Sequence, residues 1–444
     1  MRDNPERRQA VVIGASVAGL AAARALSTQF RSVVLLDRDW PPAGAVPRAG
    51  VPQGRHIHVV LPGGVRALDR LFPGLIGELV CAGSQPFDYG QSQFHLCGHW
   101  MPRVATELQS LAQTRPLLEE NLRRRVLSLP NVQSIFGASV TRLLHENSRV
   151  NGVAVQIANR DGPEELRADL VVDATGRNTR LPRWLAELGY PPVPETNVGI
   201  DLGYATGRFR PPETLRPEHP MLYVVGNPPR ETRVGVRVLV ERGEIFGGMG
   251  GYHGDYPPPD LRGFLEFARS LCRPEVFDVL SRSELISPIS LYRIPTAKRR
   301  HFARMARFPN GLLPIGDAIC SFDPAFGQGM SVAALEAEAL LACLECRRPI
   351  GGAFRRQYFR RVDAVIDVPW ALSCGENFKY PQTTGPRPLS YPLTRRYKDR
   401  VAASADASVI HDFYRVISLS APPRILLRPR AVLALLQTRR TADH

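Results

Sequence analysis

Residues 9–37 read QAVVIGASVAGLAAARALSTQFRSVVLLD. An apolar run ends at Gly14, an Ala-rich run follows it, and a second apolar run ends at Asp37. This order predicts a strand, a glycine turn, a helix and a second strand parallel to the first. Gly14 would allow the tight turn, and Gly19 would allow helix and strand to pack closely. We therefore predict an α/β fold with a Rossmann-like, three-layer domain.

The same stretch indicates a dinucleotide site. The helix after Gly14 presents free N–H groups and a partial positive charge to a pyrophosphate. Asp37 stands where a carboxylate accepts hydrogen bonds from ribose hydroxyls. Ser16 takes the place of the usual middle glycine and allows backbone approach less freely. The alternative is an α/β unit of this shape that binds nothing.

Composition narrows the class of protein. The chain has 444 residues, 44% of them hydrophobic, and a formal charge of +15, as expected for a folded protein of two or three domains. The charge favours acidic ligands, membrane surfaces or acidic partners, and no motif points to nucleic acid. We find no signal peptide, no apolar run of bilayer length, and no framework spacing among the seven cysteines. We therefore expect a cytoplasmic protein without a metal site.

Two later stretches repeat the pattern of an apolar strand with an acidic end. Residues 168–177 read ADLVVDATGR and residues 311–318 read GLLPIGDA. We expect both strands to join the first in one parallel sheet, with their carboxyl ends over one crevice. Residues 324–330, PAFGQGM, then lead into a second Ala-rich helix from 331 to 346, whose N-terminus can accept an anion.

Basic residues lie in a long loop between 38 and 64, and a loop of this length is usually functional. Arg48, Arg55, His56 and His58 could meet a phosphate or line a pocket. The alternative is a solvated basic loop. Arg115, at the start of a predicted helix, is a second candidate for a phosphate contact.

The middle of the chain has a different periodicity. Between 181 and 292 apolar and polar residues alternate, which predicts a mostly antiparallel sheet in a separate domain that covers the first. Asn151-Gly152 predicts a turn between strands at 139–144 and 153–158. The predicted boundaries are 5–75, 101–180 and 300–350 for the dinucleotide-binding part, 76–100 and 181–299 for the substrate part, and 351–444 for a helical C-terminal region.

Taken together, the opening turn, the Asp-Ala-Thr-Gly stretch at 173–176 and the Gly-Asp and Pro-x-x-Gly-x-Gly stretch at 316–329 resemble the FAD-dependent monooxygenases built like aromatic hydroxylases. The resemblance spans about residues 9–380. With residues 50–58, GVPQGRHIH, the chain looks most like the bacterial branch of polyether polyene epoxidases, related to squalene epoxidases. Flavin halogenases share this fold, but their Trp-x-Trp-x-x-Pro signature is absent from the sequence.

The resemblance implies a role for each matching residue. FAD would be the cofactor, held near its pyrophosphate and adenosine end by some residues and along its ribityl chain and isoalloxazine by others. The implied cofactor-binding residues are Gly14, Ser16, Gly19, Asp37, Arg38, Arg48, Gln53, Arg115, Asp317, Pro324, Gly327, Gln328, Gly329 and Met330. His56 and His58 are the candidates for catalytic residues in the pocket.

The implied function is the transfer of one oxygen atom from O2 to a small apolar, aromatic or polyene molecule in secondary metabolism. The reaction, an epoxidation or a hydroxylation, would pass through a flavin C4a-(hydro)peroxide. Ala174 and Arg177 depart from the motif that serves NADPH in the aromatic hydroxylases, and no second complete glycine unit is present. NAD(P)H is therefore expected to reduce the flavin either directly or through a separate flavin reductase.

Two other functions fit the same motifs. A flavin-dependent reductase of isoprenoid double bonds, similar to the geranylgeranyl reductases, would also place an apolar substrate over the flavin. A non-catalytic FAD-binding or membrane-surface protein is the other, because the C-terminal stretch is basic and carries apolar runs at 425–427 and 432–436. Such a stretch either contacts anionic lipid peripherally or packs on the FAD-binding domain. The sheet residues Phe209, Phe246, Met249 and Tyr252 are candidates to line the substrate cavity.

Overall fold

The computed structural model describes residues 7–48, 50–215 and 217–432. A parallel sheet forms around the opening stretch, since β1 (Gln9–Ile13) pairs with β2 (Ser32–Asp37) on one side and β11 (Leu170–Asp173) on the other. β18 (Leu312–Pro314) and β7 (Val132–Phe136) extend it to the order β18-β11-β1-β2-β7. The predicted α/β fold and the shared parallel sheet are confirmed.

Alanine and glycine bring the helices close to this sheet. α1 (Val17–Ser27) follows β1, and α8 (Gly329–Glu345) packs against α1 and α2 (Pro62–Leu71). Gly14 has a φ of +103°, and a Cβ on Gly19 would lie 1.7 Å from the Gly14 carbonyl oxygen. Only glycine fits at these two positions, so the predicted close approach is confirmed.

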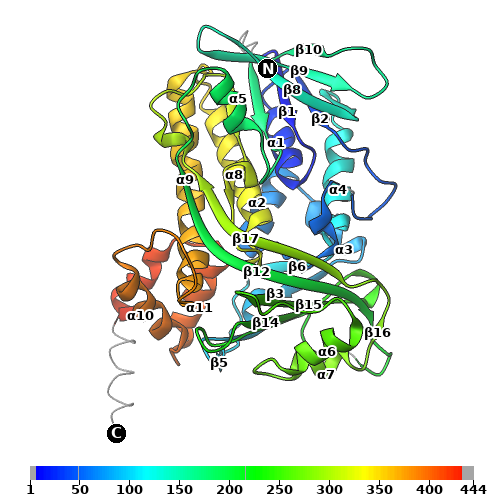
Figure 1. Cartoon of the computed structure of the whole chain (residues 1–444), viewed down its shortest axis with the longest axis vertical. Helices are drawn as coiled ribbons and strands as arrows, with labels where there is room; N and C mark the ends of the chain where they lie inside the picture. Colours follow the sequence, from blue (N-terminus) through cyan, green and yellow to red (C-terminus); the bar gives the residue numbers. More distant parts are fainter. Residues whose placement is uncertain (1–6, 49, 216, 433–444) are drawn as a thin grey trace.

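A second, larger sheet lies beside the first (Figure 1). It has the order β19-β17-β12-β15-β14-β13-β4-β5, and β12 and β17 are long curved strands in Figure 1. Pairing is antiparallel except between β13 and β4. Its strands are β4 (Gln93–Leu96), β5 (His99–Trp100), β12 (Glu195–Arg210), β13 (Met221–Val225), β14 (Arg233–Leu239), β15 (Ile245–Tyr252), β16 (Glu284–Leu285, paired with β12), β17 (Ser290–Arg300) and β19 (Cys320–Ser321).

The two faces of the large sheet have different neighbours. Phe209 and Met249 are buried under α6 (Leu261–Arg269) and α7 (Glu275–Leu280), in a cluster with Phe264. Strand alternation therefore directs them away from the parallel sheet, and their predicted place in the substrate cavity is wrong. Phe246 and Tyr252 are on the opposite face of β15, because each lies three positions from Met249 and side chains alternate along a strand.

Small elements complete the fold. β8 (Ala138–Glu146), β9 (Arg149–Ile157) and β10 (Glu164–Arg167) form one small sheet, and β3 (Gln85–Asp88) pairs with β6 (Gln109–Ala112). The predicted turn at Asn151-Gly152 is wrong, because both residues lie inside β9. Asn147 and Ser148 make the turn instead, with φ values of 49° and 59°. Their left-handed conformation suits a tight hairpin.

The remaining helices surround these sheets and form the C-terminal region. They are α3 (Leu75–Cys81), α4 (Arg115–Leu127), α5 (Leu181–Glu187), α9 (Gly352–Asn377), α10 (Tyr391–Ala402) and α11 (Ala407–Ile417). Ile425 and Leu426 are buried in a cluster that includes Phe413 of α11 and Phe94 of β4. These two residues therefore pack on the protein, while Leu427, the third residue of the apolar run, is 63% exposed. Residues 433–444, where part of the predicted membrane contact falls, lie outside the described residues.

No helix within the described residues is long and apolar enough to cross a membrane.

Candidate functional site

The crevice at the carboxyl ends of β1 and β2 brings several predicted residues together. Ser16 immediately precedes α1, and its Oγ donates to Glu119 Oε1 over 2.9 Å and accepts from Arg115 Nη2 over 2.7 Å. Asp37 accepts from the Ala15 N–H over 2.7 Å and from Arg48 Nη1 over 3.1 Å. The Ser16 side chain thus takes part in the hydrogen bonds of the site, which a glycine at this position could not do.

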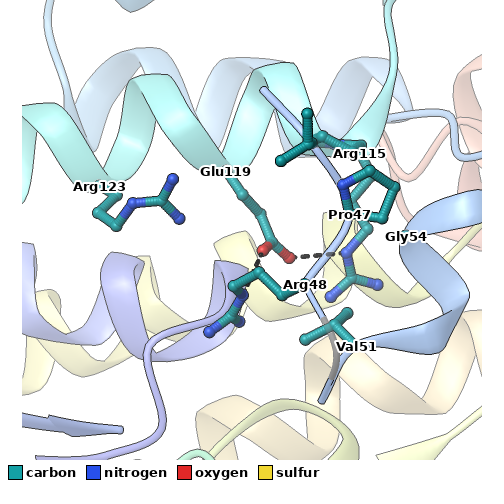
Figure 2. A pocket seen from close by; sticks show the side chains of 9 residues that line it. Pro47, Arg48, Val51, Gly54, Arg115, Glu119 and Arg123 are labelled. Carbon is teal, nitrogen blue, oxygen red and sulfur yellow. Dashed lines mark hydrogen bonds and ion pairs between the residues drawn. The ribbon is translucent and has the colours of Figure 1, made fainter. Parts of the chain in front are cut away.

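A buried carboxylate that no sequence motif indicated organises this charge network. Glu119 on α4 pairs with Arg115 over 2.7 Å and with Arg48 over 3.4 Å, and all three side chains are nearly buried. Figure 2 shows the carboxylate between the two guanidinium groups, at a small pocket that Arg123 also lines. Despite burial, the two arginines hold the pKa of Glu119 below its ordinary value. The carboxylate is therefore ionised and holds both arginines in place.

The two predicted histidines have different surroundings. His58 lies beside Arg115, with its Nδ1 2.9 Å from the His56 carbonyl oxygen and its Nε2 3.3 Å from Arg115 Nη1. Burial and then the Arg115 charge lower the pKa of His58 to about 3. A neutral His58 can donate through Nδ1 and accept from Arg115 through Nε2. His58 therefore belongs to the charge network.

His56 instead contacts the large sheet. Its Nδ1 is 3.0 Å from Thr206 Oγ1, and its ring packs edge-on against Tyr204 with ring centroids 4.6 Å apart. Burial, followed by the charge of Arg55, lowers the pKa of His56 to about 4, so the ring is neutral near pH 7. Of the two histidines, His56 is thus the one that contacts the large sheet.

The second glycine-rich turn lies at the N-terminus of α8. Asp317 lies in the short helix η5 (Gly316–Ala318), and its Oδ1 would be 3.7 Å from a Cβ on Gly329. Burial raises the pKa of Asp317, while the charges of Arg115, Arg177 and Arg300 act to lower it. Pro324 begins η6 (Pro324–Phe326), and Gly327 follows with a φ of +61°. Gln328 and Met330 are both buried.

Two predicted residues are not joined to this network by the contacts found. The Arg38 side chain is 69% exposed and lies 3.7 Å from Asp39. Gln53 lies half-buried in η1 (Pro52–Arg55), which leads to His56. Arg300 was not predicted, yet its Nη1 donates to the Ala318 carbonyl over 3.0 Å and supports the turn around Asp317.

The described residues fit FAD by their chemistry. Arg48, Arg115 and the N-terminus of α1 supply the positive groups that a pyrophosphate requires. The Gln328 Oε1 atom is buried and has no hydrogen-bond partner among the described residues, and it lies at the start of α8. An amide oxygen of this kind can accept a hydrogen bond from a ring N–H. No cluster of possible metal ligands is found in the part of the chain that the structure describes.

Comparisons with known proteins agree with this chemistry. Residues 9–179 match the family described as FAD dependent oxidoreductase. Protein Rv3254 of Mycobacterium tuberculosis is 37% identical over 356 residues, which are 78% of this chain and 74% of that protein. The chain therefore belongs to one family with Rv3254, and its first part, residues 9–179, matches the FAD dependent oxidoreductases. The predicted FAD dependence and enzyme class are confirmed.

Weaker similarities concern particular members of this class. Squalene epoxidase erg1 of Schizosaccharomyces pombe is 27% identical over 173 residues, which are 37% of this chain and 35% of that enzyme. The flavin-dependent brominase Bmp2 has a TM-score of 0.70 at 14% identity, covering 98% of this chain and 99% of the brominase. The p-nitrophenol 4-monooxygenase PnpA of Pseudomonas putida has a TM-score of 0.65 at 17% identity, covering 94% and 98%. The predicted fold of the flavin monooxygenases is thus confirmed.

A second buried carboxylate supports the turn at Gly316. Glu336 on α8 is fully buried, its Oε2 accepts from the Gly316 N–H over 2.5 Å, and its Oε1 has no partner among the described residues. Burial, followed by the charge of Asp317, raises the pKa of Glu336 from 4.5 to about 8. The folded protein therefore keeps this proton well into the neutral range.

Glu336→Gln is expected to flatten the pH dependence of stability. Between pH 5 and 8 the folded wild type holds a proton that the unfolded chain releases, so rising pH destabilises it by up to about 1.4 kcal/mol per pH unit. The glutamine variant has no such proton to release on unfolding. Its free energy of unfolding, relative to that of the wild type, should therefore increase as pH rises. Urea unfolding at pH 6, 7 and 8 measures the difference. Glu338→Gln on the same helix, where the half-buried carboxylate pairs with Arg70, should keep the wild-type slope.

Proposed function

We propose that this FAD-dependent oxidoreductase is a monooxygenase that inserts one oxygen atom from O2 into a small apolar, aromatic or polyene molecule, by epoxidation or hydroxylation. One observation carries the proposal: the large sheet meets the loop before α8. Tyr223 of β13 donates to the Ala325 carbonyl over 2.9 Å, and Val225, Val234 and Ile294 share a cluster with Ala325. An apolar surface thus covers the loop that we assign to the isoalloxazine.

In this proposal the chain binds and orients, and FAD supplies the activation of O2. Ser16, Arg48 and Arg115 hold the pyrophosphate, and Asp37 holds the adenosine ribose. The N-terminus of α8, from Gly327 to Met330, directs a partial positive charge toward the flavin, where reduction places negative charge. His56, neutral and within hydrogen-bond distance of Thr206, is the group that orients a substrate on this face of the large sheet.

The source of electrons is part of the proposal. NAD(P)H reduces the flavin, either directly or through a separate flavin reductase. Anaerobic mixing of the FAD-loaded protein with NADH or NADPH, with and without an added flavin reductase, separates the two routes. Bleaching of the visible flavin band by the nucleotide alone supports direct reduction, and bleaching only with the added enzyme supports the separate reductase.

The reaction itself is tested by product mass. The FAD-loaded protein, a flavin reductase and NADH are incubated in air with polyenes and phenols, with and without bromide. We expect a product heavier by one oxygen atom, unaffected by bromide. A gain of two hydrogens would instead establish a reductase of double bonds. A brominated product would establish a halogenase, in the manner of the flavin-dependent brominase Bmp2.

A further inference from the structure

A buried cluster of polar groups lies directly behind the loop before α8. Asp323 is fully buried, and its Oδ2 accepts from Tyr252 Oη over 2.9 Å and from Asn377 Nδ2 over 2.8 Å. Its Oδ1 accepts from the Ala325 N–H over 2.9 Å, at the start of η6. The carboxylate therefore joins the loop to the large sheet through β15 and to the end of α9.

The donors around this carboxylate are neutral. Burial raises the pKa of Tyr252 well above its ordinary value, so its hydroxyl keeps the proton that it donates. Burial also raises the pKa of Asp323, and the hydrogen bonds from Asn377, Ala325 and Tyr252 act against that rise. Burying a carboxyl group among three neutral donors costs folding free energy. A functional role for Asp323 would account for this cost.

The buried amide of Asn377 also costs folding free energy. Its Nδ2 also donates to the Ser373 carbonyl over 3.0 Å, but its buried Oδ1 has no partner among the described residues. An unsatisfied buried amide oxygen costs stability. The fold keeps this amide where an apolar side chain would avoid that cost, and what the amide provides is a donor for Asp323.

The loop is held from its other side as well. Tyr223 donates to the Ala325 carbonyl, so both backbone polar groups of Ala325 are fixed, one by Asp323 and one by β13. Gly327, with its positive φ, and Gln328 follow at once, and α8 begins at Gly329. A displacement of Ala325 would therefore move the N-terminus of α8.

We propose that Asp323 is a positioning residue for the flavin. Together with Tyr252 and Asn377, it joins the loop before α8 to the large sheet and so fixes the position of the α8 N-terminus relative to FAD. The inference rests on FAD dependence, and its consequence for substrate placement rests on the proposed function. Because loop and sheet share one carboxylate, a displacement of the sheet on substrate binding is transmitted to the cofactor.

Tyr252→Phe tests this without removing the carboxylate. The variant loses one hydroxyl donor, and we expect FAD to bind about five- to tenfold more weakly, as for one lost hydrogen bond that the loop needs. The visible spectrum of the bound flavin should shift as well. Tyr414→Phe is the matched control, since this buried hydroxyl donates to the Pro102 carbonyl over 3.0 Å, away from the loop. It should lower the melting temperature similarly and leave FAD affinity unchanged.

A double-mutant cycle completes the test. Asp323→Asn should weaken FAD binding more than Tyr252→Phe does, and the double variant should be no weaker than Asp323→Asn alone, because Tyr252 acts through Asp323. The proposal is overturned if Tyr252→Phe binds FAD like the wild type with an unchanged spectrum, or if the two effects simply add. FAD titration needs neither substrate nor turnover, so this result is independent of whether the enzyme proves to be a monooxygenase.

Discussion

Gly19→Ala is expected to abolish retention of FAD and to destabilise the fold by more than about 4 kcal/mol. The new Cβ would lie 1.7 Å from the Gly14 carbonyl oxygen and 2.8 Å from its carbonyl carbon, both backbone atoms that cannot swing aside. α1 would have to move away from β1, and the N-terminus that we assign to the pyrophosphate would move with it. The ratio of flavin to protein absorbance after gel filtration measures retention, and urea unfolding measures stability.

Gly77→Ala is the matched control, because Gly77 also lies in a helix and a Cβ there meets nothing within 4 Å. Alanine has the higher helix propensity, so this variant should be as stable as the wild type or slightly more stable, with full flavin content. Equal behaviour of the two variants would mean that the close contact of α1 with the glycine turn is wrongly placed.

Glu119→Gln has the second largest expected effect. It leaves Arg48 and Arg115 buried without their shared carboxylate, and breaking a buried ion pair costs about 3–5 kcal/mol. In the proposed site the FAD pyrophosphate binds the same two cations, so the cofactor should restore most of that loss. We expect the apoprotein to melt much earlier than the wild type and the rise in melting temperature on adding FAD to be larger than in the wild type.

Glu120→Gln provides the comparison on the same helix, because Glu120 lines a separate surface pocket with Cys81 and Arg124. This variant should leave the melting temperature of the apoprotein, and its rise on adding FAD, close to the wild-type values. If Glu119→Gln destabilised the apoprotein and FAD restored no more stability than in the wild type, the two arginines would not be pyrophosphate ligands.

The local parts of this site could be read from the sequence. Gly14, Gly19 and Asp37 follow from the order of strand, turn and helix, since each role depends on neighbours in the chain. The strands at 170–173 and 312–314 could be placed for the same reason, because apolar runs with acidic ends belong to buried parallel strands.

Contacts between segments that are distant in the sequence could not be predicted from it. Glu119 is one of several charges in the helix that follows Arg115, and its partners Ser16 and Arg48 come from other elements. Asp323 meets Tyr252 and Asn377, which lie far away in the sequence on either side. No local sequence pattern predicts such a contact. The Asn-Gly pair in β9 illustrates the converse error, in which a local preference was overridden by strand pairing on both sides of Gly152.

Incorporation of isotopically heavy dioxygen is the decisive measurement for the proposed oxygen insertion. The FAD-loaded protein, a flavin reductase and NADH are incubated under heavy dioxygen in ordinary water with the polyenes and phenols that give product in air, and the products are analysed by mass spectrometry. We predict a product that carries one heavy oxygen atom, while the second atom leaves as water. A product without heavy oxygen, or one that has gained only two hydrogens, would show that the protein is not a monooxygenase.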